Sequence, residues 1–407
     1  MTEPADAVGG NPVRALARAA EQATSGVSRA GLIGISLGVL AAGAAAGVAI
    51  ERLTVGRATR RAARAALDAE APFGSLRGRA RTVPAPDATG LYVEVDEPGQ
   101  DGSESATAAP LTVVFCHGYC LNQDSWHFQR AAFRAAGLRL VFWDQRSHGR
   151  SERSRSHLAG EPASIDQLGA DLKAVLDAVA PTGPLVLVGH SMGGMTVMAL
   201  ADQHPELFRA DPGGRVVGVA LLGTLAGGWD AATFGLPPAG ARLWRRVGPG
   251  VVKLLGSQTG LVEAARRVGS DFAGVLYRRF SFGSEAVDPA VVRFAEQLLD
   301  STPIDVVAEF YPVFAGHEKT AALRALAGLP ALVLAGTKDL LTPPVYSEAI
   351  ARELPGAELV LLPDTGHLVM LETPERVNGE LAALLRRAAE RAALPVPPAV
   401  RDLPIGD

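Results

Sequence analysis

The sequence predicts an α/β fold, in which a mostly parallel, doubly wound sheet is covered by helices on both faces. From about residue 80 onward, short apolar runs alternate with longer stretches rich in Ala and Leu. Most of these runs lack polar alternation, as expected for central strands that are covered on both sides. From about residue 228 to 319 the alternation stops and only helical patches remain. A loop of that length is implausible in a compact domain, so a helical insert is predicted there.

The individual elements follow from the same pattern. Seven short apolar runs rich in β-branched residues are predicted to be strands: 91–95, 111–116, 138–143, 185–189, 216–222, 331–336 and 358–362. The longer stretches between them are predicted to be helices: 126–136, 165–180, 192–204 and 347–354. Two further helical patches, 243–255 and 291–299, belong to the insert. The polar stretch 100–110 is predicted to be a loop between early strands.

Composition excludes several classes of protein. The net charge is −4, from 39 basic and 43 acidic residues, whereas a nucleic-acid-binding domain is clearly basic. Two cysteines are too few for a disulfide scaffold or a multi-cysteine metal cage. None of the eight histidines forms an H-x-x-x-H or H-E-x-x-H pair, which argues against a zinc site. The sequence therefore predicts neither a metal nor a nucleic-acid partner.

The N-terminal region contains an uncharged run of 21 residues, 30–50, bounded by Arg29 and Glu51. About 20 apolar residues span the hydrocarbon core of a bilayer, so a single transmembrane helix is predicted over 30–51, after an N-terminal tail of residues 1–29. A cleaved secretory signal and a buried Ala/Gly helix of a soluble domain are the alternatives. Glycines at four-residue spacing in this run would let two such helices pack closely in a homo-oligomer.

Arginines flank this run unequally, with three upstream and five just downstream. The positive-inside rule then places the C-terminal side of the run in the cytoplasm, although a secreted or cell-surface protein is the alternative. Residues 52–81 are predicted to form a basic linker helix. Such a helix either lies against anionic headgroups or is simply solvated.

The strongest motif is Gly189-His190-Ser191-Met192-Gly193, which lies between a predicted strand and a predicted helix. This is the context that a G-x-S-x-G nucleophile elbow requires. The turn is tight, so flanking Cβ atoms would collide, and the Ser191 hydroxyl is held at the N-terminus of the following helix. There the backbone N–H groups and the helix dipole favour developing negative charge.

With this motif, residues 82–393 resemble an α/β-hydrolase-fold protein. Residues 113–119 resemble the strand and His-Gly loop that supply half of the oxyanion hole, which implies that the backbone N–H groups of Tyr119 and Met192 bind the oxyanion. Residues 143–151 resemble the family's D-x-R-G-x-G-x-S loop, with Ser147 and His148 where glycine is commonest. That loop is structural in the family, so Asp144, Arg146 and His148 are not predicted to be catalytic.

The resemblance also implies the other two members of a catalytic triad, in the chain order Ser, acid, His. Asp339 follows the predicted strand 331–336 and matches the acid, while His367 follows the last predicted strand and matches the base. His367 would take the Ser191 proton, and Asp339 would fix the tautomer of His367 and stabilise its imidazolium form. Asp230 and Asp364 are the rival acids.

These motifs divide the chain into a hydrolase core over 82–228 and 321–393, a helical cap over 229–320 and a flexible tail over 394–407. A serine nucleophile favours acyl transfer, so the predicted function is cofactor-independent hydrolysis of a carboxylic ester, with a small-molecule or lipid acyl substrate. A thioesterase, a carbon–carbon hydrolase or a haloperoxidase-like perhydrolase would use the same triad. A non-catalytic ligand-binding protein is the alternative from another class.

Four further residues are predicted to have structural roles. Cys116 is predicted to be buried in a strand and Cys120 to lie in the pocket wall. Trp126 is predicted to pack a helix, and His317 is predicted to lie in an exposed turn of the insert.

Overall fold

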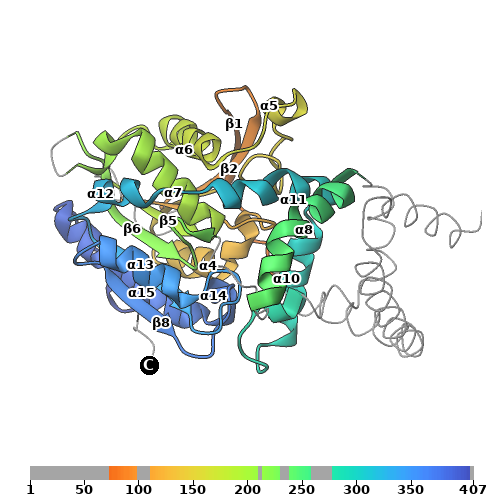
Figure 1. Ribbon diagram of the computed structural model, residues 1–407. Coiled ribbons are helices and arrows are strands. Elements are labelled where there is room, and N and C mark those ends of the chain that lie inside the picture. Colours follow the sequence, from red (N-terminus) through yellow and green to blue (C-terminus); the bar gives the residue numbers. More distant parts are fainter. Residues whose placement is uncertain (1–72, 99–110, 210–212, 230–237, 258–276, 404–407) are drawn as a thin grey trace, which may run out of the picture. The chain divides into compact units, whose positions relative to one another are not determined.

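The computed structural model describes residues 73–98, 111–209, 213–229, 238–257 and 277–403, all within the second of two compact units, residues 66–407. Its centre is an eight-stranded sheet with the order β1-β2-β4-β3-β5-β6-β7-β8 (Figure 1). The strands are β1 (Arg79–Pro84), β2 (Gly90–Asp96), β3 (Thr112–Cys116), β4 (Arg139–Trp143), β5 (Leu185–His190), β6 (Val216–Leu222), β7 (Ala331–Gly336) and β8 (Glu358–Leu362).

Only β2 pairs antiparallel with its neighbours, β1 and β4, and all the other strand pairs are parallel. β3, β5 and β7 are buried along their whole length, which explains their uninterrupted apolar sequences. The seven predicted strands are confirmed to within one residue at each end. The carboxyl ends of the parallel strands meet at one edge, where an open α/β sheet binds its ligands.

The edge strand β1 was not predicted, because only Val83 of its six residues is buried and no apolar run marks it. The prediction of a linker helix over 52–81 is wrong for residues 73–81, which form a turn, an extended segment and the start of β1. Residues 79–84 pair along their whole length with β2, so the ladder hydrogen bonds override the basic, helix-like composition.

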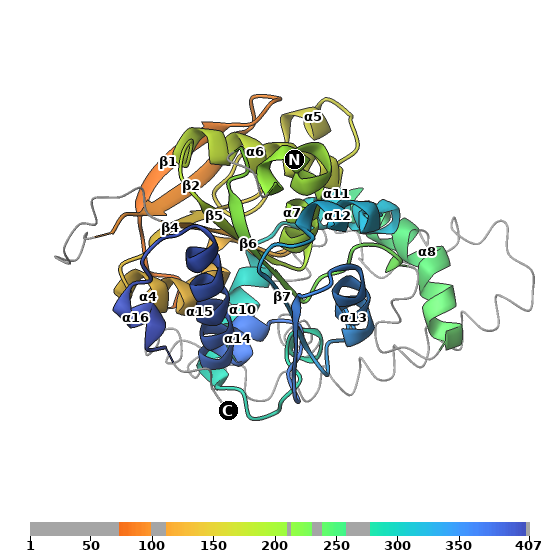
Figure 2. The same ribbon diagram turned by 90° about the vertical axis from the view of Figure 1, so that its left-hand side faces the viewer.

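Helices cover both faces of the sheet (Figure 2). One face is packed by α4 (His127–Ala135), α14 (Val369–Glu372) and α15 (Pro374–Arg391), the other by α6 (Ile165–Val179), α7 (Met192–Gln203), α12 (Leu323–Leu326) and α13 (Pro344–Glu353). Side chains from β3 and β5 alternate between the two cores. For example, Phe115 and Val188 lie in the first core, and Val114 and Leu187 lie in the second. The four predicted helices of the core are confirmed, with small shifts at their ends.

Between β6 and β7, the described residues include α8 (Pro238–Ser257), α10 (Pro289–Asp300), α11 (Ile304–Phe310) and the 3₁₀ segment Tyr311–Gly316. Both predicted helical patches fall within α8 and α10. Asp288 caps α10 by accepting a hydrogen bond from the backbone N–H of Ala290, and Pro289 occupies the first helical position. The limits 229–320 for a separate cap domain stay a prediction.

The predicted flexible tail is wrong for residues 394–403. A short helix, α16 (Pro398–Arg401), packs against α15, and Val400 is fully buried. Leu394, Val396 and Leu403 also pack against the first core. This segment was predicted to be flexible, but the apolar side chains between its prolines pack against the core and bury apolar surface there.

Several predictions fall outside the described residues: the tail 1–29, the transmembrane helix 30–51, residues 52–72 of the linker and the loop 100–110. Within the described ranges, no helix combines the length and the apolar character that crossing a membrane requires.

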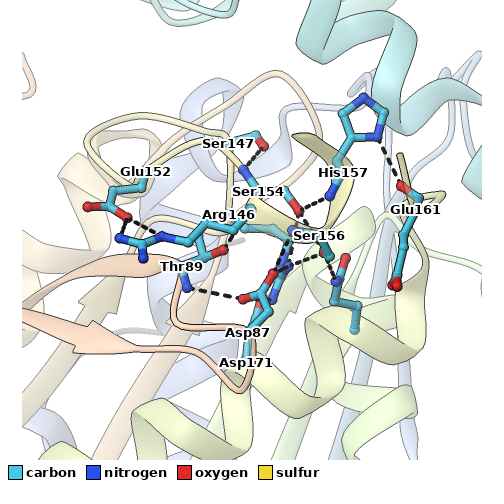
Figure 3. A network of polar contacts seen from close by, with 12 residues as sticks. Asp87, Thr89, Arg146, Ser147, Glu152, Ser154, Ser156, His157, Glu161 and Asp171 are labelled. Carbon is cyan, nitrogen blue, oxygen red and sulfur yellow. Dashed lines mark hydrogen bonds and ion pairs between the residues drawn. The ribbon is translucent and has the colours of Figure 1, made fainter. Parts of the chain in front are cut away.

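The loop after β4 is held in place by the buried side chain of Arg146, which forms hydrogen bonds to two other segments (Figure 3). Its guanidinium lies 2.5–2.6 Å from both carboxylate oxygens of Asp171 on α6 and 2.8 Å from Asp87 in the β1–β2 turn. Burial raises the pKa of Asp171 to about 6 against the opposing effect of Arg146. Burial also raises the pKa of Asp87, but hydrogen bonds from Arg146, Thr89 and Ser156 outweigh it, so that this pKa is well below its usual range.

Buried ionisable groups make the stability of the fold pH-dependent. Burial lowers the pKa of His117 to about 3, of His148 and His317 to about 4, and of His190 well below its ordinary value. These side chains are neutral in the fold, so as the pH falls below about 6.5 the unfolded chain takes up protons that the folded chain does not. Each such histidine then costs about 1.4 kcal/mol of stability per pH unit until its folded pKa is reached.

Three buried carboxyl groups act in the opposite direction. Burial raises the pKa of Asp144 and Asp171 to about 6, and that of Glu309 above its ordinary value, so the folded state binds these protons first. Each of the four histidines costs about 2 kcal/mol between pH 6.5 and pH 5, and the carboxyl groups offset about half of that sum, so we expect the free energy of unfolding to fall by about 4 kcal/mol from pH 7 to pH 5. Urea unfolding at both pH values measures this change, and equal or greater stability at pH 5 would contradict it.

Candidate active site

The turn between β5 and α7 holds Ser191 in a strained backbone conformation, with φ +52° and ψ −119°. A Cβ atom at Gly189 would lie 2.5 Å from the carbonyl oxygen of Gly193, and one at Gly193 would overlap the carbonyl of Cys116. The glycines of the motif are therefore required by the close approach of three backbone segments. Ser191 is at the N-cap of α7, but its side chain makes no capping hydrogen bond.

The predicted acid and base are brought together. The Asp339 Oδ2 atom lies 2.8 Å from His367 Nδ1, and both residues are buried. Asp339 also accepts hydrogen bonds at Oδ1 from the backbone N–H groups of Leu341 and Thr342. With its carboxylate held on both oxygens, Asp339 fixes the His367 tautomer that carries its proton on Nδ1. His367 Nε2 is then the nitrogen that can accept a proton.

Thr342 is a site residue that sequence reasoning missed. Its hydroxyl lies 2.8 Å from Asp339 Oδ2, 2.8 Å from the Gly223 carbonyl oxygen and 3.2 Å from His367 Nδ1. The only local signal was that Thr342 stands three residues after Asp339, in a turn that an Asp side chain can close by accepting hydrogen bonds from nearby backbone N–H groups. The single hydroxyl proton of Thr342 can be donated either to Asp339 Oδ2 or to the Gly223 carbonyl oxygen, so Thr342 lies between the acid and the loop after β6.

Replacing Thr342 by valine is expected to lower kcat about tenfold, because it removes a hydrogen bond to a charged carboxylate while keeping the shape of the side chain. KM should stay within about twofold, and the apparent pKa of the kcat profile should move, since Thr342 acts only through Asp339 and His367. Thr342→Ser should restore most of the activity. An unchanged pH profile in Thr342→Val would contradict this positioning role.

His190, inside the nucleophile motif, contacts both the backbone and the ring of His367, the proposed base. It is fully buried, its Nε2–H donates to the backbone carbonyl of His367 at 2.9 Å, and the two rings are 4.7 Å apart. Burial and the nearby His367 both lower the pKa of His190 well below its ordinary value. His190 is therefore a neutral, fixed support rather than a second base.

The predicted oxyanion loop lies beside the nucleophile. A Cβ atom at Gly118 would lie 2.8 Å from His190 Nδ1 and 3.3 Å from Ser191 Cβ, so only glycine lets the loop approach this closely. The Tyr119 side chain is clamped under the insert, because its hydroxyl donates to the Val307 carbonyl and its ring lies 5.1 Å from that of Phe314. Met192 is fully buried at the start of α7. The roles of the Tyr119 and Met192 N–H groups stay predictions.

A pocket of about 280 Å³ contains Ser191 and His367 in its wall. Its remaining lining is mostly apolar and aromatic: Tyr119, Cys120, Leu121, His190, Met195, Trp229, Tyr277, Phe280, Ser281, Leu299, Tyr311, Phe314, Leu341, Thr342 and Leu368. Most of the aromatic side chains come from the insert, whereas Ser191, Asp339 and His367, which are predicted to react, follow the ends of strands. The predicted place of Cys120 in this wall is confirmed.

Other predicted residues lie as follows. Asp364 is exposed and forms an ion pair with Lys338 at 2.8 Å, so it is not the acid that contacts His367. Asp230 lies outside the described residues. Cys116 and Trp126 are fully buried, as predicted. The prediction of an exposed His317 is wrong, because His317 packs against the loop after β6 and donates from Nε2 to the Leu225 carbonyl at 3.0 Å.

The loop after β4 also plays the structural part that was predicted for it. Asp144 accepts hydrogen bonds from the backbone N–H groups of Gln123 and Arg150, and Gly149 has φ +55°. Ser147 adopts φ +64°, which explains why glycine is commonest there. Its hydroxyl donates to Glu309 on α11 at 3.1 Å, a link from core to insert that glycine could not make.

A comparison with known protein families matches residues 113–380 to the alpha/beta hydrolase family. The chain belongs to this family. All the predicted reactive groups lie inside the matched region, from the Tyr119 loop to His367. The fold class predicted from the sequence is confirmed for the hydrolase core.

Individual relatives of this hydrolase are distant. The acetyltransferase component of the acetoin cleaving system of Pseudomonas putida is 29% identical over 70% of this chain, which spans only 65% of that relative. A bifunctional esterase/perhydrolase of Acinetobacter calcoaceticus is 26% identical over 68% of this chain and 92% of its own. The structure of a thermophilic esterase from Thermogutta terrifontis matches with a TM-score of 0.57 and 25% identity, over 76% of this chain and 98% of its own.

Proposed function

We propose that this protein is a serine hydrolase that cleaves carboxylic esters with a lipophilic acyl group. The observation that carries the proposal is that Ser191 and His367 line one apolar pocket while Asp339 lies 2.8 Å from His367 Nδ1. A nucleophile, a base within the same pocket and a group that orients the base are the parts that acyl transfer needs. The strained Ser191 turn at a helix N-terminus supports the same reaction.

In this mechanism, Ser191 Oγ attacks the ester carbonyl carbon while His367 Nε2 takes the hydroxyl proton. The carbonyl oxygen becomes an oxyanion that accepts hydrogen bonds from the backbone N–H groups of Tyr119 and Met192. Collapse of the tetrahedral intermediate breaks the ester C–O bond, and His367 returns the proton to the departing alcohol. Water then attacks the acyl-enzyme by the same steps and releases the acid.

The pocket supports an apolar acyl group. Its aromatic walls are supplied by the insert, with Trp229, Tyr311 and Phe314 among the lining residues. A polar substituent on the acyl chain would lose its water and find few partners, since the lining outside Ser191 and the histidines is apolar or aromatic apart from Cys120 and the hydroxyl groups of Ser281, Thr342 and three tyrosines. We expect kcat/KM for aryl esters to rise with acyl length until the pocket is full.

A fluorophosphonate probe tests the assignment. It should label the wild-type protein covalently and leave Ser191→Ala unlabelled, because the probe needs an activated serine hydroxyl. Ser281→Ala is a matched control, since Ser281 lines the same pocket outside the proposed reactive set and its loss should leave labelling intact. Labelling of Ser191→Ala would overturn the proposal, and so would a wild-type protein that is not labelled. An unlabelled wild-type protein that still binds ligands would point to a non-catalytic binding protein.

A second candidate is perhydrolysis, in which hydrogen peroxide replaces water in attack on the acyl-enzyme and a peracid is released. The likeness to the Acinetobacter esterase/perhydrolase over 92% of that protein favours it. Peracid formation in the presence of peroxide and an ester separates the two reactions. Thioesters and vinylogous diketones in the same panel test the thioesterase and carbon–carbon hydrolase alternatives.

The membrane anchor over 30–51, with the hydrolase on the cytoplasmic side, stays a prediction. Deletion of residues 1–55 should release an active enzyme from the membrane fraction, since every proposed reactive group lies beyond residue 115. A mature chain that begins near residue 50 and is found outside the cell would contradict both the anchor and its orientation.

A further inference from the structure

The helix α8 (Pro238–Ser257) carries an exposed apolar strip. Leu243, Val247, Val251 and Leu254 are 62%, 45%, 41% and 63% exposed. Their spacing of four, four and three residues places them on one side of a helix with 3.6 residues per turn. They account for four of the seven large hydrophobic side chains exposed in the described part of the chain, so the strip is a concentrated feature rather than scattered surface.

The same helix carries a basic strip. Arg242, Arg246 and Lys253 are exposed, at spacings of four and seven residues, and α8 contains no acidic residue. On a helical projection this strip lies beside the apolar one, and together they make up the solvent side of α8. A wholly solvated helix of this length would usually carry acidic residues as well.

The inner side of α8 is already occupied. Ala241 and Gly248 are buried there, and a Cβ atom at Gly256 would overlap the side chain of Ala308 on α11. The two helices therefore pack closely through small residues, and the apolar strip is not an alternative packing surface facing α11. Figure 1 shows α8 beside α11, on the side of the described sheet domain away from β8.

We propose that α8 docks the hydrolase on the surface of a bilayer that contains anionic lipid. The four apolar side chains would enter the boundary between headgroups and acyl chains, and the basic strip would contact lipid phosphates. Charge complementarity selects this occupant, because a helix with only basic charges attracts an anionic surface and repels a second copy of itself. The docking does not rest on the proposed esterase activity, since it is measured as binding of the protein to lipid vesicles.

The position of α8 gives the docking a consequence for the site. α8 packs against α11, whose Val307 carbonyl holds Tyr119, and α11 continues directly into the segment that supplies Tyr311 and Phe314 to the pocket wall. Docking would therefore place the aromatic wall of the pocket close to the lipid surface from which a lipophilic ester would come. This step does rest on the proposed function, whereas the docking itself does not.

A local probe tests the proposal in the full chain, whether or not residues 30–51 also bind the membrane. Leu254→Cys is labelled with nitrobenzoxadiazole, and the protein is reconstituted with vesicles of phosphatidylcholine alone or with about a third phosphatidylglycerol. We expect a blue-shifted emission that is at least about twofold stronger with the anionic vesicles, because the probe enters an apolar region. The labelled parent protein sets the background from Cys120.

The emission of a matched probe at Leu359→Cys, on the edge strand β8, should not change when vesicles of either composition are added. Arg246→Gln with Lys253→Gln should weaken docking about fivefold per charge, or about 1 kcal/mol each, whereas Arg324→Gln with Arg352→Gln should have little effect. No change at residue 254 in anionic vesicles would overturn the proposal. An equal change without anionic lipid would also overturn it, as would a change that follows protein concentration without vesicles and so indicates self-association.

Discussion

Replacing His367 by alanine is expected to lower kcat for a cleavable ester by about 10⁴-fold or more, while KM changes little. His367 is held by Asp339 at Nδ1 and by His190 at its backbone carbonyl, so its remaining nitrogen is available for proton transfer from Ser191. Without that base the serine hydroxyl is a weak nucleophile at neutral pH. Steady-state kinetics on a long-chain aryl ester measure the loss.

The double variant Ser191→Ala/His367→Ala tests whether the two residues act in the same catalytic step or contribute to the rate independently. If the two residues act in one step, the double variant should be no slower than either single variant. His204→Ala is the matched control, because His204 pairs with Glu206 at the surface and should keep full activity. A loss below about tenfold in His367→Ala, or a double variant whose losses multiply, would contradict the proposed mechanism.

Replacing Arg146 by methionine is expected to lower the free energy of unfolding by about 3–5 kcal/mol. The Arg146 guanidinium is buried and forms an ion pair with the Asp171 carboxylate, whose side chain has no exposed surface. It also forms an ion pair with Asp87 (Figure 3). Methionine keeps much of the volume but leaves the Asp171 carboxylate buried without its partner. Urea unfolding at pH 7 measures the change.

Arg155→Met is the control in the same loop. Arg155 pairs with Glu152 at 3.0 Å, but both side chains are about half exposed, and such pairs contribute about 0–1 kcal/mol. Adding Asp171→Leu to Arg146→Met should recover part of the stability, since the unpaired buried charge is then removed as well. An Arg146→Met variant no less stable than Arg155→Met would contradict the structural role of this network.

The local sequence predicted most of the core of the fold and named the candidate reactive residues. Continuous apolar runs such as 111–116 and 185–189 predicted buried parallel strands, because both faces of such a strand are covered and neither carries polar side chains. The Gly189–Gly193 motif predicted the elbow because its steric requirement is local to the turn. The resemblance of the segment after strand 331–336 to the family's acid-bearing loop selected Asp339 over Asp364, and Asp339 is the residue that lies beside His367.

Tertiary structure decided the features that depend on contacts between distant segments. The edge strand β1 is ordered by pairing with β2, and the C-terminal residues by packing on α15, although neither segment has a periodic apolar pattern. Thr342 and Gly223, 119 residues apart, meet only when β6 and β7 are neighbours. The burial of His317, the clamp on Tyr119 and the exposed strip of α8 likewise depend on how the insert packs, because a single sequence specifies which faces are apolar but not what covers them.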